Sequence, residues 1–314
     1  MYQPLKLKPA LKDYIWGGDR LIKDWNKSSE KNAVAESWEM SCHNGGPSVI
    51  DGGEYDGKLL KDVINADMLG ENAKKFEFFP ILVKLIDAKD NLSIQVHPDD
   101  EYALKNEGEY GKTEMWYVVE ANEGAGVYCG FNKEYTKDEV KKALEEGVIT
   151  DILNFIEVKS GDTLFINSGT VHAICGGLLI AEIQQNSSLT YRLFDYNRVD
   201  KDGNKRELHI AKSIDVIDSS RVVSANETVN VIDGVTRELA KCKYFTAYVH
   251  SVNSTYDINV TEESFVGITA IGGVGNIEYN GVSYPIEKGD TYFLPAGMGK
   301  VTLKGAIEAI SYRV

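Results

Sequence analysis

The segment that decides the fold runs from residue 91 to residue 114 and reads NLSIQVHPDDEYALKNEGEYGKTE. Apolar and polar side chains alternate from Leu92 to His97, the period of a β-strand with one buried face. In such a strand Gln95 and His97 project from the same face. Pro98 ends the strand, and the acidic residues 99–101 are typical of the first turn of a helix. The segment therefore predicts a strand that presents an amide and an imidazole side by side.

Two further residues complete a set of metal ligands. Glu114 opens the apolar run EMWYVV, and His172 lies in GDTLFINSGTVHAI. Two imidazoles, a carboxylate and an amide oxygen suit a borderline divalent cation, most plausibly zinc. A lone histidine at a strand end is more often an ordinary surface or core residue, so the prediction depends on all four residues together. We expect Gln95, His97, Glu114 and His172 to bind a single Zn²⁺ per chain within a β-barrel.

The chain contains an internal control for this prediction. The frame of Gly161, Asn167, Gly169 and His172 resembles the second cupin motif, with asparagine where proline is usual. The same frame returns at residues 287–300, EKGDTYFLPAGMGK, where the proline is present and Lys300 takes the place of the histidine. The Gly-Asp turn is therefore structural in both copies, whereas the histidine is specific to the first.

The repeat predicts a mainly β fold made of two cupin-like (jelly-roll) β-barrels with a few short helices in the N-terminal part. Residues 1–222 form a metal-binding catalytic domain with helical additions, and residues 223–314 form a degenerate, metal-free domain. FFPILVKLIDA (residues 78–88) predicts a central strand, and TKDEVKKALEEG (residues 136–147) predicts a helix that begins at a capping threonine. Residues 239–314 read as strands only.

Composition narrows the classes of function. The 314 residues carry a net charge of −14 and no basic stripe, which argues against nucleic acid as a partner. The N-terminus lacks a signal-peptide pattern, and no apolar run approaches the ~20 residues of a membrane span. The four cysteines lack CxxC spacing. We expect a reduced, cytoplasmic protein; Cys175 could approach the metal but is more simply a packing residue.

Several motifs together resemble type I phosphomannose isomerase, also called mannose-6-phosphate isomerase, in its short bacterial form. They are LSIQVHP (residues 92–98), GKTEMWY (residues 111–117), GTVHA (residues 169–173) and QNSSLTYRLFDY (residues 185–196), with weaker matches at WGG (residues 16–18) and ESWE (residues 36–39). The resemblance implies a zinc-dependent cupin enzyme that interconverts mannose 6-phosphate and fructose 6-phosphate. It implies the same four metal ligands and a sugar phosphate as the small-molecule partner.

The resemblance also implies roles for three further residues, Lys112, Arg192 and Ser93, and the sequence itself singles out Lys84. Lys112 and Arg192 match positions in the catalytic region, and Ser93 matches a position in the substrate pocket. Lys112 shares the strand face of Glu114, so it could act as a base beside the metal or only bind substrate oxygens. Arg192 stays protonated and suits an anion clamp, although a structural pair with Asp195 is the alternative. Lys84, inside an apolar strand, either lines the barrel or extends to its rim.

Two positions depart from the family pattern. The longer relatives often carry histidine where this chain has Gly111, and aspartate where it has Ser188. Because both positions have been assigned proton-transfer roles, the general base stays open. Lys84 and Arg198 are candidates for binding the phosphate. The competing functions are a cupin oxygenase that uses iron, a non-catalytic sugar-phosphate binder, and an isomerase of another hexose phosphate.

Overall fold

The structure is a computed structural model that describes residues 2–199, 202–220 and 236–314. It is mainly β with a few short helices, as predicted. The strands form three sheets, of nine, six and five strands. No sheet closes into a barrel within the described residues, so the predicted pair of separate barrels is not confirmed. The predicted domain boundary at residues 222 and 223 lies outside the described residues.

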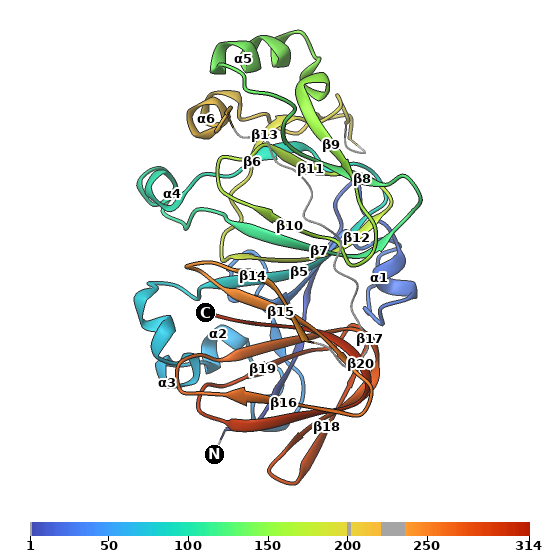
Figure 1. Ribbon diagram of the computed structural model, residues 1–314, viewed down its shortest axis with the longest axis vertical. Coiled ribbons are helices and arrows are strands. Elements are labelled where there is room, and N and C mark those ends of the chain that lie inside the picture. Colours follow the sequence, from blue (N-terminus) through green and yellow to red (C-terminus); the bar gives the residue numbers. More distant parts are fainter. Residues whose placement is uncertain (1, 200–201, 221–235) are drawn as a thin grey trace.

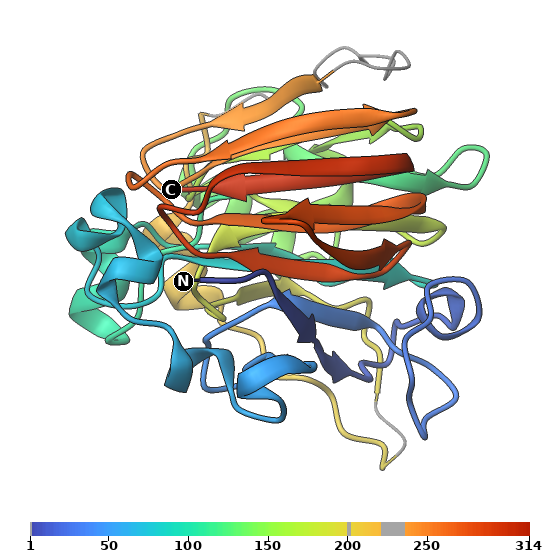
Figure 2. The same cartoon turned by 90° about the horizontal axis from the view of Figure 1, so that it is seen from below.

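The nine-stranded sheet contains the C-terminal strands and two strands from the start of the chain. Its main path is β14 (Thr236–Lys241), β15 (Thr246–Val252), β20 (Gly299–Arg313), β17 (Val266–Tyr279), β19 (Thr291–Leu294), β1 (Leu5–Lys8) and β4 (Val49–Ile50). β16 (Thr255–Val260) pairs with β20, and β18 (Val282–Glu287) pairs with β17. Figure 2 shows β1 beside the C-terminal strands. The N-terminus is thus built into the sheet of the second copy.

The six-stranded sheet lies between the other two. Its order is β10 (Thr163–Ile166), β7 (Glu114–Ala121), β12 (Leu178–Gln185), β5 (Ile81–Ala88), β3 (Glu36–Met40) and β2 (Ala10–Lys12). One apolar cluster joins it to the nine-stranded sheet and a second joins it to the five-stranded sheet, which gives the layers seen in Figure 1. Because both faces are covered, β5 and β12 are buried along their whole length.

The five-stranded sheet has the order β13 (Tyr191–Phe194), β6 (Ile94–Val96), β11 (His172–Ile174), β8 (Gly126–Phe131) and β9 (Leu153–Glu157). Its outer side packs against α5 (Lys137–Glu145) and the segment after α6 (Ile210–Val216). Thr136 caps the start of α5, as the sequence predicted, and Glu139 completes a capping box with it. The segment after β6 forms α4 (Asp100–Asn106), capped by Asp99. The remaining helices are α1 (Arg20–Lys23), α2 (Leu60–Val63), α3 (Ala66–Leu69) and the short 3₁₀ turns Gly53–Tyr55, Glu71–Lys75 and Ile149–Ile152.

The Gly-Asp turn has the same geometry in both copies of the repeat. Gly161 and Gly289 adopt φ angles of 91° and 94°, which favour glycine. The Asp162 carboxylate accepts a hydrogen bond from the backbone nitrogen three residues earlier, as does that of Asp290. Lys300, at the position of His172, is exposed and pairs with Asp257. The two copies predicted from the sequence therefore share the Gly-Asp turn. At the position of His172, however, the second copy has Lys300, whose side chain points to solvent.

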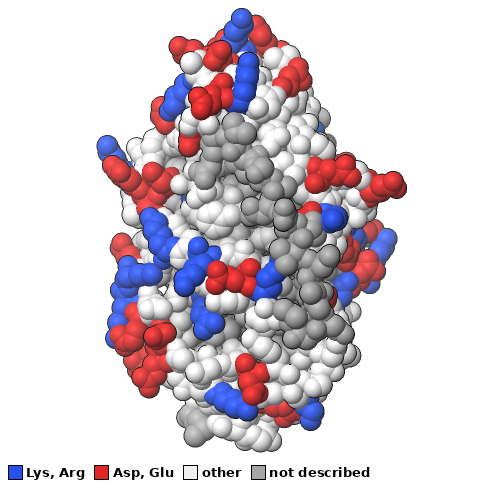
Figure 3. Space-filling view, viewed as in Figure 1, with Lys and Arg blue, Asp and Glu red and all other residues white. Residues whose placement is uncertain are grey.

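The surface agrees with an acidic chain that lacks a basic stripe. In Figure 3 acidic and basic side chains are interspersed over the face shown, without a continuous basic patch among the residues described there. None of the helices that the structure describes has the length and apolar character needed to cross a membrane. His250 forms hydrogen bonds with Thr236 and Ser311, so it serves the C-terminal sheet.

Gly267 offers a test of the packing between sheets. A Cβ atom there would lie 2.0 Å from Cε2 of Tyr312 and 2.7 Å from Cε of Met40. We expect Gly267→Ala to lower the free energy of unfolding by about 1–3 kcal/mol through overpacking, measured by denaturant titration. Gly272→Ala, on the same strand, is the control, because its nearest neighbour is the flexible Glu308 side chain. Equal stability losses in the two variants would contradict this account.

Candidate metal centre and cleft

The site lies between the six-stranded and five-stranded sheets. On the middle sheet, alternation places Val83 and Leu85 of β5 toward the nine-stranded sheet and Lys84 toward the five-stranded one. Glu182 of β12 is the register partner of Lys84 and shares its face. Across from them, β6, β11 and β13 are adjacent strands that carry Gln95, His172 and Arg192. Residues from distant parts of the chain are thus brought together by strand pairing.

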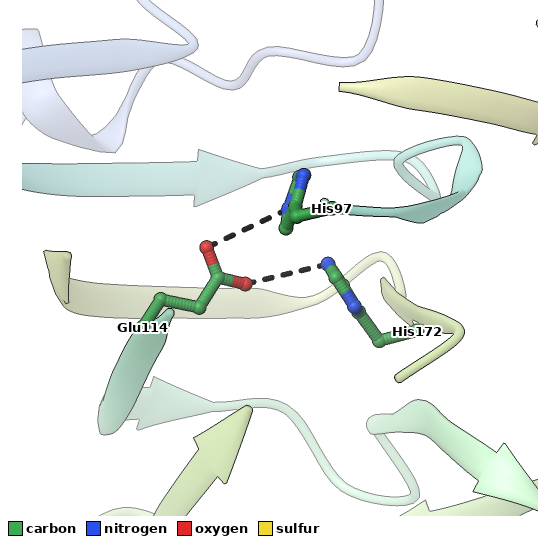
Figure 4. Close-up of side chains that lie close together, drawn as sticks. All are labelled: His97, Glu114 and His172. Atoms are coloured by element: carbon green, nitrogen blue, oxygen red, sulfur yellow. Dashed lines mark ion pairs between the residues drawn. The ribbon is translucent and has the colours of Figure 1, made fainter. Parts of the chain in front are cut away.

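The side chains of His97, Glu114 and His172 point toward one another inside this site (Figure 4). Their ligand atoms lie within 4.8 Å of one another, and all three residues are buried. Nε2 of His172 is 3.3 Å from Oε1 of Glu114, and Nε2 of His97 is 3.7 Å from Oε2. His172 contacts the backbone carbonyl of Thr170 through Nδ1 at 2.9 Å, which leaves Nε2 to face the carboxylate. The Nε2 atoms of the two histidines and the Glu114 carboxylate therefore face a common point, where a cation could bind.

The chemistry of these donors fits a divalent cation. Neither oxygen of Glu114 has a hydrogen-bond donor in good geometry among the described residues, although both are buried. Burial lowers the pKa of His172 to about 4, and it lowers the pKa of His97 well below its ordinary value. Both imidazoles are therefore neutral at pH 7, the state that binds metals. Burial and the nearby Glu182 charge raise the pKa of Glu114 to about 8, an effect that a bound cation would oppose.

Gln95 stands beside this group. Its Nε2 lies 3.4 Å from Nε2 of His172, and its Oε1 lies 3.5 Å from Oγ of Ser93. Rotating the amide end by half a turn would direct the oxygen toward the cluster, since this rotation only exchanges the positions of the amide oxygen and nitrogen. The structure thus places all four predicted ligands together. Cys175 is buried, but it is not part of the cluster of ligand atoms.

Two lysines and a glutamate extend the cluster. Nζ of Lys112 lies 2.5 Å from Oε2 of Glu114, 3.1 Å from Nε2 of His97 and 3.8 Å from Oε1 of Glu182. Glu182 also pairs with Lys84 at 3.0 Å and accepts a hydrogen bond from Trp116. Burial alone would raise the pKa of Glu182, but Lys112 and Lys84 lower it well below its ordinary value. Lys84 is buried and paired, so it does not extend to a sheet rim.

Arg192 and Ser93 lie at the opposite wall. Nε of Arg192 donates to Oγ of Ser93 at 3.3 Å, and Nη1 donates to the carbonyl of Glu207 at 2.7 Å. Asp195 is paired with Arg198 and Arg206 instead. The alternative of a structural pair between Arg192 and Asp195 is therefore not what the structure shows. Arg192 is held by neutral partners and keeps its charge available.

An open cleft of about 420 Å³ leads to these residues. Its lining includes Ser93, Gln95, Lys112, Lys84 and Arg192, together with groups that the sequence interpretation did not assign: Glu36, Glu182, Lys12, Arg206, Trp16, Trp38 and His43. Glu182 could have been found, because a carboxylate inside the apolar run LLIAEIQQ has the same unusual setting as Lys84. Lys12 and Arg206 lie in segments without such a signal. Arg198 does not line the cleft, since its guanidinium is bonded to Asn91 and Asp195.

The two departures from the family pattern have different surroundings. A Cβ atom at Gly111 would lie 2.3 Å from the carbonyl carbon of Asp99 and 2.6 Å from the nitrogen of Asp100, so a histidine there would displace the start of α4. Ser188 is exposed and lines the cleft, and its backbone nitrogen donates to Glu109 at 3.3 Å. The backbone in this chain therefore excludes the missing imidazole at residue 111, while residue 188 has room for a larger group.

Comparisons with known proteins agree with this geometry. Residues 5–142 match the family model of the type I phosphomannose isomerase catalytic domain, and residues 235–314 match that of the mannose-6-phosphate isomerase cupin domain. The chain is 37% identical to mannose-6-phosphate isomerase ManA of Bacillus subtilis, over 98% of each chain. It is 36% identical to mannose-6-phosphate isomerase of Streptococcus mutans, over 99% of this chain and 98% of that protein.

Solved structures give the same result. The crystal structure of a mannose 6-phosphate isomerase from Bacillus subtilis matches with a TM-score of 0.91 and 35% identity, over 100% of both chains. A phosphomannose isomerase from Salmonella typhimurium matches with a TM-score of 0.78 at 17% identity, which supports the fold alone. The resemblance found in the sequence motifs is therefore confirmed, and the chain belongs to the type I phosphomannose isomerase family of aldose–ketose isomerases.

Proposed function

We propose that this protein interconverts mannose 6-phosphate and fructose 6-phosphate, with a zinc ion held by Gln95, His97, Glu114 and His172. The observation that carries the proposal is a buried His/Glu/His cluster directly behind Gln95 and Lys112, which line a cleft that also exposes several cations. Family membership supports the substrate class. The donor set of two imidazole nitrogens and two oxygens favours zinc over iron, because iron oxygenases in this fold usually need more histidines.

The reaction moves a proton between two adjacent carbons of the sugar. When bound, the metal would supply a Lewis acid that polarises the substrate carbonyl and stabilises the developing enediolate. Lys112 supports proton transfer in this proposal, because its amine lies beside the cluster and opens to the cleft. Binding of substrate oxygens by Lys112, without proton transfer, is the alternative. Arg192 would stabilise negative charge on the sugar oxygens, since it remains protonated.

The phosphate needs cations away from the metal. Lys12 and Arg206 line the cleft, and Arg206 reaches it while anchored to Asp195. Lys84 also lines the cleft, but its ammonium is already paired with Glu182 and Glu36. We therefore assign the phosphate to Arg206, with Lys12 as its nearest alternative, and keep Lys84 and Ser93 as groups that contact the sugar. This choice replaces Arg198, which does not line the cleft.

The division into a catalytic cupin domain, residues 1–222, and a metal-free cupin domain, residues 223–314, is part of the same proposal. The shared Gly-Asp turn supports a common ancestry of the two units. Strands β1 and β4 do not follow this division. They lie within residues 1–222, but they pair into the sheet formed by the C-terminal strands. The chain is expected to act in the cytoplasm on a small-molecule substrate.

The first test is a coupled assay of mannose 6-phosphate conversion on protein of known metal content. We expect turnover that is lost on chelation and restored by Zn²⁺, with about one zinc per chain. Free mannose is the control substrate, and it should turn over poorly because it lacks the phosphate that Arg206 would bind. A zinc-loaded chain that does not convert mannose 6-phosphate would shift the assignment to another hexose phosphate or to a binding role.

His172→Ala tests the metal site separately from the fold. We expect this variant to lose metal and activity and yet to remain folded, because the second copy forms the same turn with Lys300 at the equivalent position. Metal analysis, circular dichroism and the assay above measure the three properties. Global unfolding of His172→Ala would count against the comparison between the copies.

Arg206→Ala tests the assignment of the phosphate. Loss of a charged hydrogen bond of about 1.5–3 kcal/mol should raise KM for mannose 6-phosphate by about 10–100-fold, with a smaller change in kcat. Arg198→Ala is the matched control, because Arg198 binds the same Asp195 carboxylate without lining the cleft. If both variants raise KM equally, the effect comes from the Asp195 network and not from contact with the phosphate.

A further inference from the structure

The segment that carries Lys112 into the site has no regular secondary structure. Residues 107–113 lie between α4 and β7, outside any sheet. Three backbone nitrogens fix its end: Gly111 donates to Oδ1 of Asp100 at 2.9 Å, Lys112 donates to the carbonyl of Pro98 at 3.0 Å, and Thr113 donates to Oε1 of Gln185 at 2.9 Å. The positions of Lys112 and of the adjoining ligand Glu114 therefore depend on what holds these acceptors.

Asp100 anchors two of these three contacts, those of Gly111 and Thr113, on either side of Lys112. Its Oδ1 also accepts a hydrogen bond from Nε2 of Gln185 at 2.8 Å, so one carboxylate oxygen holds both Gly111 and the side chain that binds Thr113. Asp99, not Asp100, caps the helix by accepting from Tyr102, which leaves the Asp100 carboxylate free for this role. The backbone of Asp100 also packs closely against Gly111, where an added Cβ atom would contact the start of α4.

The other oxygen of Asp100 is bound by the metal-free part of the chain. The hydroxyl of Tyr244, in the turn between β14 and β15, donates to Oδ2 of Asp100 at 2.7 Å. In Figure 1 this turn of the nine-stranded sheet reaches the side of the molecule on which α4 lies. Burial, followed by the hydrogen bond to Asp100, raises the pKa of Tyr244, so the phenol remains a donor at neutral pH. The Tyr244 ring itself is largely buried.

A second cleft lies beside this hydrogen bond, with both Asp100 and Tyr244 in its lining. Asp99, Asp100, Thr113, Phe165 and Tyr244 are among the residues that line a space of about 480 Å³ between the β14–β15 turn and the middle sheet. Packing around Tyr244 is therefore incomplete on this side, and its hydroxyl reaches Asp100 directly.

We propose that Tyr244 is a positioning residue that acts through Asp100 to hold Lys112 and Glu114 in place, so that the metal-free unit tunes the metal centre of the other. The contacts form one path: the Tyr244 hydroxyl to Asp100, Asp100 to Gly111 and Gln185, and these two to the strand that carries the metal ligand. The inference rests on the proposed function for its effect on turnover. Its effect on metal affinity is independent of the substrate.

The decisive variant is Tyr244→Phe, which removes the hydroxyl and keeps the ring. Affinities are measured by competition with a chromogenic chelator, with Zn²⁺ and with Co²⁺, whose absorption spectrum reports the ligand geometry. Residues beyond the ligands typically change metal affinity or activity by about 10–100-fold. Because Tyr244 acts through Asp100, we expect about a tenfold loss of affinity, a changed Co²⁺ spectrum, and a similar fall in kcat with KM changed less than about twofold.

Tyr312→Phe is the matched control. Tyr312 is fully buried in the same C-terminal sheet, and its hydroxyl contacts Thr269 at 2.9 Å, away from Asp100. We expect it to lower the melting temperature at least as much as Tyr244→Phe while leaving metal affinity unchanged. Asp100→Asn should weaken metal binding at least as much as Tyr244→Phe, and combining the two should add little, because both break the same path.

Two outcomes would overturn the inference: metal affinity within about twofold of wild type in Tyr244→Phe, or an equal loss of affinity in Tyr312→Phe. The first would make Tyr244 a packing residue, and the second would trace the effect to stability alone. If the wild type binds metal without converting mannose 6-phosphate, but Tyr244→Phe still weakens binding, the proposed function fails and the positioning role stands.

Discussion

The row of buried charges behind the cleft is the constraint on which the rest of the structure depends. Glu36, Lys84, Glu182, Lys112 and Glu114 follow one another with an oppositely charged neighbour within 4.0 Å at each step. Burying an unpaired charge costs on the order of several kcal/mol of free energy, so each charged side chain of the row needs its oppositely charged neighbour. A bound divalent cation would favour the ionised form of Glu114, and with both imidazoles neutral the three carboxylates, the two ammonium groups and the cation would then sum to +1. That sign suits an anionic intermediate and an anionic substrate.

Strand order explains how the row is assembled. Glu36 comes from β3, Lys84 from β5, Glu182 from β12 and Glu114 from β7, which are consecutive neighbours in the middle sheet. Because the pleat places these side chains on one face, antiparallel registers suffice to align them. Apolar residues on the other face of the same strands pack against the nine-stranded sheet. The middle sheet therefore carries four of the five charges on one side while its other side forms a core, and Lys112 joins them from the segment before β7.

The sequence predicted the parts of this arrangement that leave a local pattern. The alternation around His97, the helix cap at Thr136 and the Gly-Asp turns each depend on neighbouring residues, and each was recognised. Lys84 was recognised as anomalous, but its partner Glu182 lies 98 residues later, and only strand pairing brings the two together. The open sheets, and the pairing of β1 with β19, depend on packing between units and leave no local pattern. Arg206 was missed for the same reason, since only the fold directs that loop into the cleft.

The metal-free unit is best understood through what its sheet provides to the other. Its copy of the motif keeps the Gly-Asp turn, but the position of His172 is taken by Lys300, which is exposed and pairs with Asp257. Its strands instead cover the apolar face of the middle sheet, and they take in β1 and β4 from the start of the chain. The C-terminal strands thus pack on one face of the middle sheet, whose other face carries the cluster. The proposed metal site tolerates only small displacements of its ligands, so this packing would support it.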